Sequence, residues 1–383
     1  MKQFLNSKYL IWCLLIISLI SALRNLFFQL VSDEIQYAEI GKNIVTTGQF
    51  YLYGQPSTFT PTLPFLVSFF YIKSVPFISF TLVKLFNLLL MIIGLKYSFL
   101  FLKKLKLPSR IVILIIVLSA VNNATVVWST AIYPEPILFC ALWIFLYYVV
   151  EDIRTLRQVA YILVPFLILV ITRYVYAVLI PIVAYYILKY LIQLYKDNNY
   201  KTIRNVILIS FICLIPLLIW FKYVVLVEQE NSLNVSYFTR FKNKDIFYNL
   251  KAGLGLIKHE EVDKVNGIPA FISLFVPVTG IRNWIVSIIL IISFSIGLLS
   301  RWEIKEYRIL TICIFLVMLG LIFAGTGFSR YWLVLLPGFW VGFYLLFIQL
   351  KLKQIYFENM ALILATLYII NELRLDYIIL NKL

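Results

Sequence analysis

The chain has 383 residues, of which 62% are hydrophobic and only 14% are charged, whereas a soluble domain is about one quarter charged. This composition excludes an ordinary soluble domain. The net charge is +16, but the basic residues lie mostly in short segments between apolar runs, so the charge indicates membrane topology and no nucleic-acid partner. The four cysteines lie within apolar runs and the only histidine is His259, which disfavours a disulfide framework, a histidine metal cluster and a Ser-His-Asp triad.

Apolar runs recur along the whole chain, and a stretch of about 20 apolar residues crosses the hydrocarbon core of a bilayer. Because a backbone in lipid must satisfy its own hydrogen bonds, and the alternating pattern of barrel strands is absent, these runs predict helices. We predict an all-α polytopic membrane protein with about ten or eleven transmembrane helices. The predicted spans are 9–30, 78–102, 110–128, 134–150, 159–172, 175–195, 205–227, 283–300, 308–325, 331–349 and 356–371.

The distribution of basic residues predicts the orientation of these spans. Lys2 and Lys8 precede the first apolar run, as in a signal peptide, but we expect an uncleaved first span because many further spans follow. Basic residues in alternate connections place the N-terminus in the cytoplasm and the C-terminus outside. The further cytoplasmic residues are Lys103, Lys104, Lys106, Arg110, Arg154, Arg157, Lys196, Lys201, Arg204, Arg301, Lys305, Arg308, Lys351 and Lys353.

Two long outer segments divide the chain. We predict an N-terminal transmembrane module over 1–227, which contains the first outer loop (24–75), then an extracytoplasmic loop over 228–282 and C-terminal transmembrane helices over 283–383.

The first outer loop is predicted to contain two helices that lie along the membrane interface. A short amphipathic helix follows Asp33, and a second apolar segment over 63–72 follows Pro61 and is too short to span the bilayer. The residues that indicate the first helix recur at helical spacing and are Tyr37, Ile40, Gly41 and Ile44.

Charges close to the membrane on one side are the informative residues of such a chain. Asp33, Glu135, Arg173 and Arg330 each lie at the outer end of a predicted span. They come from distant parts of the sequence, yet the topology puts them at the same depth and on the same face. This arrangement predicts a site at the outer membrane surface.

The two acidic residues each have a structural and a functional interpretation. Asp33 with Gln36 three residues later fits a helix capping box, and Asp33 also fits a general base that accepts a proton from a hydroxyl group. Glu135 lies between Pro134 and Pro136, where the dipole of the next helix favours an acidic side chain. Its functional interpretation is a group that orients an acceptor or an ion.

The two arginines are open to the same pair of interpretations. Each guanidinium group either reaches the interface as a long side chain or binds a phosphate through paired hydrogen bonds. Arg330 is the better phosphate candidate, because Gly325 and Gly327 nearby let the backbone approach a ligand closely.

Three motifs resemble the GT-C superfamily of membrane glycosyltransferases, in particular the branch with protein O-mannosyltransferases and the aminoarabinose transferases of lipid A. The first outer loop of that branch reads acidic pair, tyrosine, alanine, glycine and then a proline pair. This chain departs from the pattern at Pro61-Thr62, where the family often has adjacent prolines. The matching motifs are Asp33-Glu34, Tyr37-Ala38, Gly48 and Pro61-Thr62-Leu63-Pro64; Tyr133-Pro134-Glu135-Pro136; and Arg330-Tyr331 through Leu336-Pro337.

The resemblance implies an inverting transfer of a sugar from a polyprenyl-phosphate carrier to a lipid, glycan or protein acceptor. Asp33 would be the catalytic base beside Glu34, and Arg330 and Arg173 would hold the donor phosphate. Glu135 and Tyr37 would orient the acceptor or an ion. Some relatives use a divalent metal and others show no clear need for one, so metal dependence stays open, with Glu34 and Glu135 as the available ligands.

Aromatic residues of the first outer loop offer stacking surfaces for a sugar, although an interfacial aromatic belt explains them as well. They are Tyr37, Phe50, Tyr51 and Tyr53. The membrane lipids that surround such an enzyme are expected to be those of a bacterial plasma membrane, because no eukaryotic retention signal is evident.

Three other classes of protein compete with this interpretation. A transporter or flippase would favour charges buried at mid-membrane and paired, broken helices, which this sequence does not indicate. A polysaccharide polymerase or ligase would carry arginines and often a histidine in a large outer loop, and Arg240 and His259 keep that class open. A structural membrane protein would leave the outer charges without a shared cavity.

Overall fold

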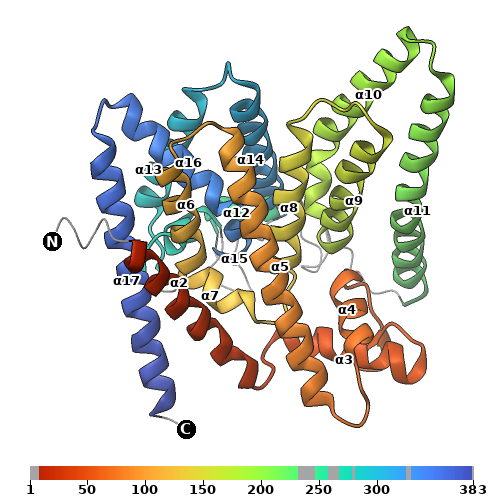
Figure 1. The fold of residues 1–383 in the computed structure, drawn as a ribbon. Helices are drawn as coiled ribbons and strands as arrows, with labels where there is room; N and C mark the ends of the chain where they lie inside the picture. Colours follow the sequence, from red (N-terminus) through yellow and green to blue (C-terminus); the bar gives the residue numbers. More distant parts are fainter. Residues whose placement is uncertain (1–7, 232–245, 258–266, 278–280, 325–328, 382–383) are drawn as a thin grey trace.

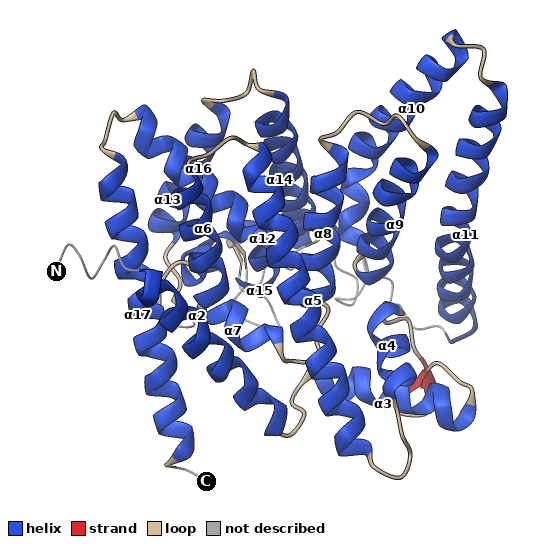
Figure 2. Cartoon of the chain, in the orientation of Figure 1, coloured by secondary structure: helices blue, strands red, loops and turns tan. Residues whose placement is uncertain are grey.

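The structure of the chain is a computed structural model that describes residues 8–231, 246–257, 267–277, 281–324 and 329–381. The described chain is nearly all helical, and its one hairpin pairs β1 (Tyr51–Leu52) antiparallel with β2 (Gln55–Pro56) (Figures 1 and 2). The α-helices are α2 (Lys8–Leu23), α3 (Asp33–Thr47), α4 (Thr62–Phe70), α5 (Pro76–Lys104), α6 (Ser109–Val121), α7 (Asn123–Ser129), α8 (Glu135–Val149), α9 (Leu156–Thr172), α10 (Ile180–Lys196), α11 (Tyr200–Asn231), α12 (Ile246–Leu254), α13 (Trp284–Leu299), α14 (Lys305–Phe323), α15 (Ser329–Trp332), α16 (Leu336–Gln349) and α17 (Gln354–Leu380). The 3-10 helices are η1 (Arg24–Phe27), η2 (Tyr174–Leu179), η3 (Ile268–Leu274) and η4 (Leu333–Leu335).

The helices confirm the predicted all-α polytopic membrane fold. Among the described residues, six helical segments are long and apolar enough to cross a membrane, and α6 with α7 form a seventh that is bent by 59°. The apolar helices α8, α9 and α13 are shorter, and α17 runs for 27 residues at the edge of the bundle (Figure 1). Every predicted span coincides with one of these segments.

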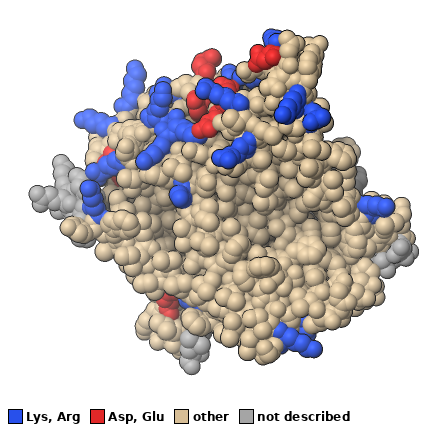
Figure 3. Space-filling model, turned by 45° about the vertical axis from the view of Figure 1, so that its right-hand side comes forward, with Lys and Arg blue, Asp and Glu red and all other residues tan. Residues whose placement is uncertain are grey.

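Lysine and arginine side chains gather at one end of the bundle, above a broad band with few charges (Figure 3). The connections α5–α6, α8–α9, α10–α11, α13–α14 and α16–α17 lie at this end (Figure 1). Asp152, in the α8–α9 connection, links this connection to α10 and α14. Its Oδ1 accepts hydrogen bonds from Lys189 Nζ of α10 at 2.9 Å and from Lys305 Nζ of α14 at 3.0 Å. These two bonds hold the pKa of Asp152 below its ordinary value. The sequence predicts that this end faces the cytoplasm, and the orientation stays a prediction.

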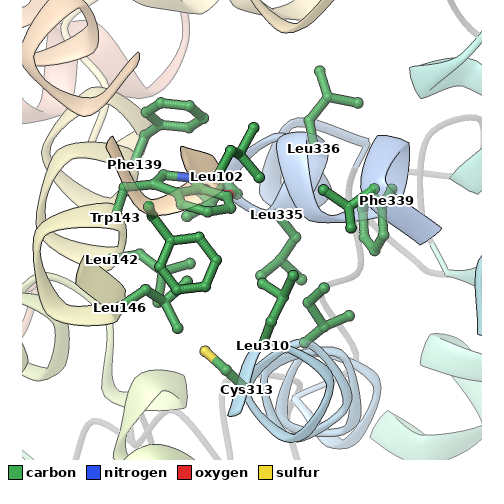
Figure 4. Packing of buried hydrophobic residues seen from close by; sticks show 14 of the residues in the cluster. Leu102, Phe139, Leu142, Trp143, Leu146, Leu310, Cys313, Leu335, Leu336 and Phe339 are labelled. Carbon is green, nitrogen blue, oxygen red and sulfur yellow. Dashed lines mark hydrogen bonds between the residues drawn. The ribbon is translucent and has the colours of Figure 1, made fainter. Parts of the chain in front are cut away.

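The hydrophobic core joins α8, α14 and α16. Trp143 from α8, Leu310 from α14 and Phe339 from α16 lie in one close-packed cluster and are fully buried (Figure 4). Trp143 also donates a hydrogen bond from Nε1 to the carbonyl oxygen of Val334 at 3.1 Å, which ties α8 to the segment before α16. The core therefore fixes α8 against the segment that follows Arg330.

The predicted span 110–128 is interrupted at Asn122. The Asn122 side chain accepts a hydrogen bond from the Ala124 N–H at 2.9 Å and donates one to the Leu274 carbonyl at 2.7 Å. Asn122 thereby caps the N-terminus of α7 and ends α6, because the capping conformation is not helical. The bend directs α7 across the bundle, so that it ends close to the start of α8.

The last helix, α17, continues beyond the predicted end of its span at 371. Arg24, the first residue of η1, forms an ion pair with Glu372, where Nη2 lies 2.6 Å from Oε2, and a second with Asp376. Asn123 adds a hydrogen bond to the other Glu372 oxygen at 2.5 Å. A charge inside the membrane persists when it is paired, and these partners let α17 carry two carboxylates where sequence analysis predicted an end.

The first outer loop contains the two predicted helices, α3 and α4, packed against each other (Figure 1). The hairpin between them was not predicted; positive φ angles at Tyr53 and Gly54, 51° and 76°, allow its tight turn. Gly41 makes the close approach of α3 to α4 possible, because a Cβ atom at this position would collide with Val67 and lie 3.0 Å from the Pro64 carbonyl oxygen.

We expect Gly41→Leu to lower the thermal stability of the purified protein by several degrees. The added side chain overpacks the α3–α4 contact, and overpacking of a close contact costs about 1–3 kcal/mol. The measurement is thermal unfolding in detergent, with Lys42→Leu as the control, because Lys42 is the exposed neighbour on the same helix. Equal melting temperatures for the two variants would contradict the close packing of α3 on α4.

Within the second outer loop, α12 packs against α14, and η3 packs against α13. Arg240 and His259 lie outside the described residues, as do Gly325 and Gly327. The division into three domains stays a prediction.

Candidate active site

The structure brings the four predicted outer charges together. Arg330 Nη2 donates a hydrogen bond to Asp33 Oδ2 at 3.0 Å, and Arg173 Nη2 donates one to Glu135 Oε1 at 2.7 Å. Arg330 Nε lies 3.6 Å from the same Glu135 oxygen and joins the two pairs into one cluster. The residues come from the start of α3, the start of α8, the end of α9 and α15, so the predicted convergence of distant segments is found.

Glu135 is the buried centre of this charge cluster. Its side chain is completely buried, and Arg173 and Arg330 are only 11% and 15% exposed. Removing such charges from water is unfavourable unless they are paired and hydrogen-bonded, and here two guanidinium groups face one carboxylate. Glu135 is also the first residue of α8, where the positive end of the helix dipole favours its negative charge.

Aromatic rings enclose the two guanidinium groups. The Arg173 guanidinium carbon lies 3.6 Å from the centre of the Tyr331 ring, and that of Arg330 lies 4.6 Å from the Tyr133 ring and 5.4 Å from the Trp128 ring. Such cation–π contacts are favourable and hold the planar groups in place. Tyr133 and Tyr331 belong to the recognised motifs, whereas Trp128 was missed, because in the sequence it looks like one of many aromatic residues near a membrane interface.

Asp33 does not act as the helix cap that one interpretation predicted. The residue before the helix is Ser32, with a φ of 51°, and the start of α3 has no side-chain cap. The Asp33 carboxylate points to Arg330 instead, and 35% of its side chain is exposed, against none of Glu135. Asp33 is therefore the carboxylate of the cluster that a molecule from outside reaches most easily.

Glu34 lies next to the cluster but contacts backbone. Its Oε1 accepts a hydrogen bond from the Ile132 N–H at 2.7 Å, and its Oε2 accepts one from the Val31 N–H at 3.1 Å. The Glu34 side chain is buried and links the segment before α3 to the segment before α8. This geometry suits a structural link between the segments that carry Asp33 and Glu135.

Tyr37 lies one helical turn after Asp33 and is buried against Phe59, with the ring centres 5.6 Å apart and the rings perpendicular. Burial raises the pKa of its hydroxyl group above the ordinary value, so this hydroxyl group keeps its proton at neutral pH. Its electrostatic neighbours include Arg173, Glu135 and Asp33, which places it at the cluster.

The other predicted stacking residues differ in their surroundings. The ring of Phe50 packs against Trp220 and Tyr223 of α11, at centre-to-centre distances of 5.1 and 6.1 Å, so it serves a contact within the protein. Tyr51 pairs in the hairpin, and the Tyr53 side chain is 65% exposed.

The residues at the cluster do not fit a divalent-metal site. Within the described part of the chain, no group of three or more histidine, cysteine or acidic side chains is placed to hold a metal. Both oxygens of Glu34 are engaged by backbone N–H groups, and Glu135 faces two guanidinium groups, which repel a cation. We therefore derive no chemical step through a metal.

Comparisons with solved structures identify the fold. ArnT from Cupriavidus metallidurans in the apo state matches with a TM-score of 0.50 and 12% sequence identity over 87% of this chain and 58% of that one. The Archaeoglobus fulgidus oligosaccharyltransferase matches in its apo form, with a TM-score of 0.50 and 15% identity over 96% of this chain and 56% of that one. The same enzyme tethered to an acceptor peptide with the NVT sequon matches with a TM-score of 0.51 and 15% identity over 96% and 55%.

The chain has the GT-C fold. Both proteins are GT-C glycosyltransferases, and the fold implied by the sequence resemblance is confirmed. The chain spans a little over half the length of these GT-C structures, and its sequence identity to them is low. The comparison therefore shows the fold and does not show an activity. Searches of protein-family models and of curated proteins find no match.

Proposed function

We propose that the protein is a membrane glycosyltransferase that transfers a sugar from a polyprenyl-phosphate carrier to an acceptor at the extracytoplasmic face, with inversion at the anomeric carbon. The observation that carries this proposal is the cluster of Asp33, Arg330, Glu135 and Arg173 in a chain with the GT-C fold. Glu135 and Arg173 lie at the ends of α8 and α9 away from the basic α8–α9 connection, which supports an outward-facing site (Figure 1). We propose a bacterial plasma membrane as its location.

Arg330 and Arg173 are proposed to bind the donor phosphate. Guanidinium groups bind phosphate oxygens through paired, charge-assisted hydrogen bonds, and these two groups converge on one Glu135 oxygen. Negative charge develops on the phosphate as its bond to the sugar breaks. Cationic groups that are already held in position by Glu135 stabilise that charge as it develops.

Asp33 is proposed to act as the general base that accepts the proton of the acceptor hydroxyl group. The hydroxyl oxygen forms the new bond to the anomeric carbon while the bond from that carbon to the phosphate oxygen breaks. In-line attack with inversion places the base and the leaving phosphate on opposite faces of the sugar. The Asp33–Arg330 ion pair therefore has to open when the donor sugar enters between the two side chains.

The remaining predicted residues are assigned supporting roles. Glu135 orients both guanidinium groups from the start of α8, and Tyr37 offers a neutral hydroxyl group to the acceptor. Glu34, predicted as a catalytic residue, is proposed to position Asp33, because both of its oxygens bind backbone N–H groups.

The proposal is tested by incubating the protein in liposomes with radiolabelled sugars on polyprenyl-phosphate carriers and a mixture of lipid, glycan and peptide acceptors. We expect label transfer together with release of free polyprenyl phosphate, and we expect Arg330→Met to lower transfer by at least about 100-fold, in the range found when one charge-stabilising group is removed. The matched control is Arg374→Met, since Arg374 is an exposed arginine near the outer end of α17.

Two results would contradict the proposal. Transfer that survives Arg330→Met would remove the assignment of the phosphate site. Movement of an intact lipid-linked sugar across the membrane, without transfer, would favour a flippase instead.

A further inference from the structure

One turn of α5 carries two buried polar side chains that sequence analysis did not single out. Lys84 is 3% exposed and Asn87 is completely buried, although both lie within an apolar transmembrane helix. They are three residues apart, so they project from the same face of the helix. Polar groups inside a membrane are unfavourable unless they are paired, and they commonly serve a function.

Lys84 binds the segment that leads to Asp33. Its Nζ donates hydrogen bonds to the carbonyl oxygens of Asn25 and Phe28, at 2.8 and 3.0 Å. These carbonyls lie in and just after η1, where the Asn25 carbonyl also accepts a long hydrogen bond from the Phe28 N–H at 3.4 Å. The ammonium group therefore fixes the path of the chain a few residues before Asp33.

Asn87 binds the segment that leads to Glu135. Its Nδ2 donates hydrogen bonds to the carbonyl oxygens of Ala131 and Tyr133, at 2.6 and 3.3 Å. Tyr133 also presents its ring to Arg330, and Glu135 follows two residues later. The amide group therefore fixes the loop between α7 and α8 on the same turn of α5.

Glu34 links the same two chain segments to each other. It binds the Ile132 N–H within the loop that Asn87 holds, and it lies near enough to Lys84 to attract its charge. Lys84, Asn87 and Glu34 thus connect the two chain segments to one rigid helix and to each other.

On the basis of the proposed function, we infer that Lys84 and Asn87 are positioning residues that set the distance between the Asp33 carboxylate and the Arg330–Glu135 pair. Both side chains donate their hydrogen bonds to backbone carbonyl groups, so each acts on the charge cluster through the chain segment that it binds. A displacement of a reacting group by about 1 Å can lower the rate about 100-fold. Loss of the hydrogen bonds of Lys84 or of Asn87 therefore slows transfer without removing a catalytic group.

The first test measures geometry and needs no transfer. In a background without the native cysteines, Asp33→Cys and Arg330→Cys are cross-linked with a short bifunctional thiol reagent, with and without Lys84→Met. We expect Lys84→Met to slow cross-linking by at least about 10-fold, whereas Lys96→Met, an exposed lysine on the same helix, leaves the rate unchanged. Equal rates in all three backgrounds overturn the inference.

The second test separates positioning from binding. We expect Lys84→Met and Asn87→Leu to lower kcat for transfer by about 10- to 100-fold with a KM for the donor within about threefold of wild type, and Lys84→Arg to recover part of the loss. A rise in KM at constant kcat overturns the inference. Melting curves show whether each variant is folded. If Lys84→Met is not folded, the cross-linking rate in the Lys84→Arg background replaces it as the test of geometry. Absence of transfer by the wild type would count against the proposed function and leave the cross-linking result to decide this inference.

Discussion

Asp33→Asn is expected to lower kcat for sugar transfer by about 100- to 10,000-fold, the usual contribution of a general base. The asparagine side chain keeps the shape of the carboxylate but cannot accept the proton of the acceptor hydroxyl group. The same variant is expected to bind polyprenyl phosphate more tightly than the wild type. The reason is that Arg330 Nη2 donates to Asp33 Oδ2, so that the donor phosphate has to compete with this carboxylate.

The two halves of this prediction are measured separately, transfer with a radiolabelled donor and binding with the free carrier lipid. Glu39→Gln is the matched control, because Glu39 lies on the same helix and its Oε1 accepts a hydrogen bond from the Tyr53 N–H of the hairpin at 3.0 Å. Transfer within a few-fold of wild type in Asp33→Asn would remove the base assignment. Weaker binding of the carrier lipid would show that Asp33 and the phosphate do not compete.

Glu135→Leu is expected to reduce the free energy of unfolding by about 3–5 kcal/mol, the range for breaking a buried ion pair on one side. The substitution leaves Arg173 and Arg330 largely buried without their shared carboxylate. The measurement is unfolding by titration with a denaturing detergent. Glu151→Leu is the control, because Glu151 pairs with Lys104 at the other end of the bundle while 42% exposed, and exposed pairs contribute about 0–1 kcal/mol.

A double-mutant cycle with Arg173→Met distinguishes the ion pair from simple loss of packing. Removing both partners is expected to cost clearly less than the sum of the two single substitutions, because no unpaired charge remains from that pair. Costs that add within about 0.5 kcal/mol would mean that Glu135 and Arg173 do not interact directly.

The helices were predictable because lipid imposes a simple rule on the sequence: a long apolar run has few alternatives to a helix. The outer charges were predictable for a related reason, since each of Asp33, Glu135, Arg173 and Arg330 lies at the end of such a run. The topology that the basic connections indicate puts these residues at one depth on one face, but it does not say which of them pair. The GT-C fold was predicted from short motifs, and the comparisons confirm it.

The breaks within helices were not predictable, because single polar side chains with distant partners cause them. Asn122 ends α6 by binding the Leu274 carbonyl, 152 positions away, and no local pattern identifies that partner. The polar residues of α5 were missed for a similar reason. Lys84 looks like an interrupting charge in the sequence, and its carbonyl partners lie 56 and 59 positions earlier in the chain.

The hydrogen-bond partners of Asp33 and Glu34 could not be assigned from sequence either. The two residues are adjacent and chemically alike, yet one faces Arg330 and the other faces backbone N–H groups. The two side chains leave the start of α3 in different directions, just after Ser32, whose φ is 51°.

The most direct test of the proposed site is an experimental structure of the protein with polyprenyl phosphate in lipid nanodiscs. We predict density for the phosphate between the Arg330 and Arg173 guanidinium groups, at the distances of about 2.7–2.9 Å that charge-assisted hydrogen bonds have, with Asp33 moved away from Arg330. A phosphate bound away from both arginines, with the Asp33–Arg330 pair still closed, would contradict the proposed donor site.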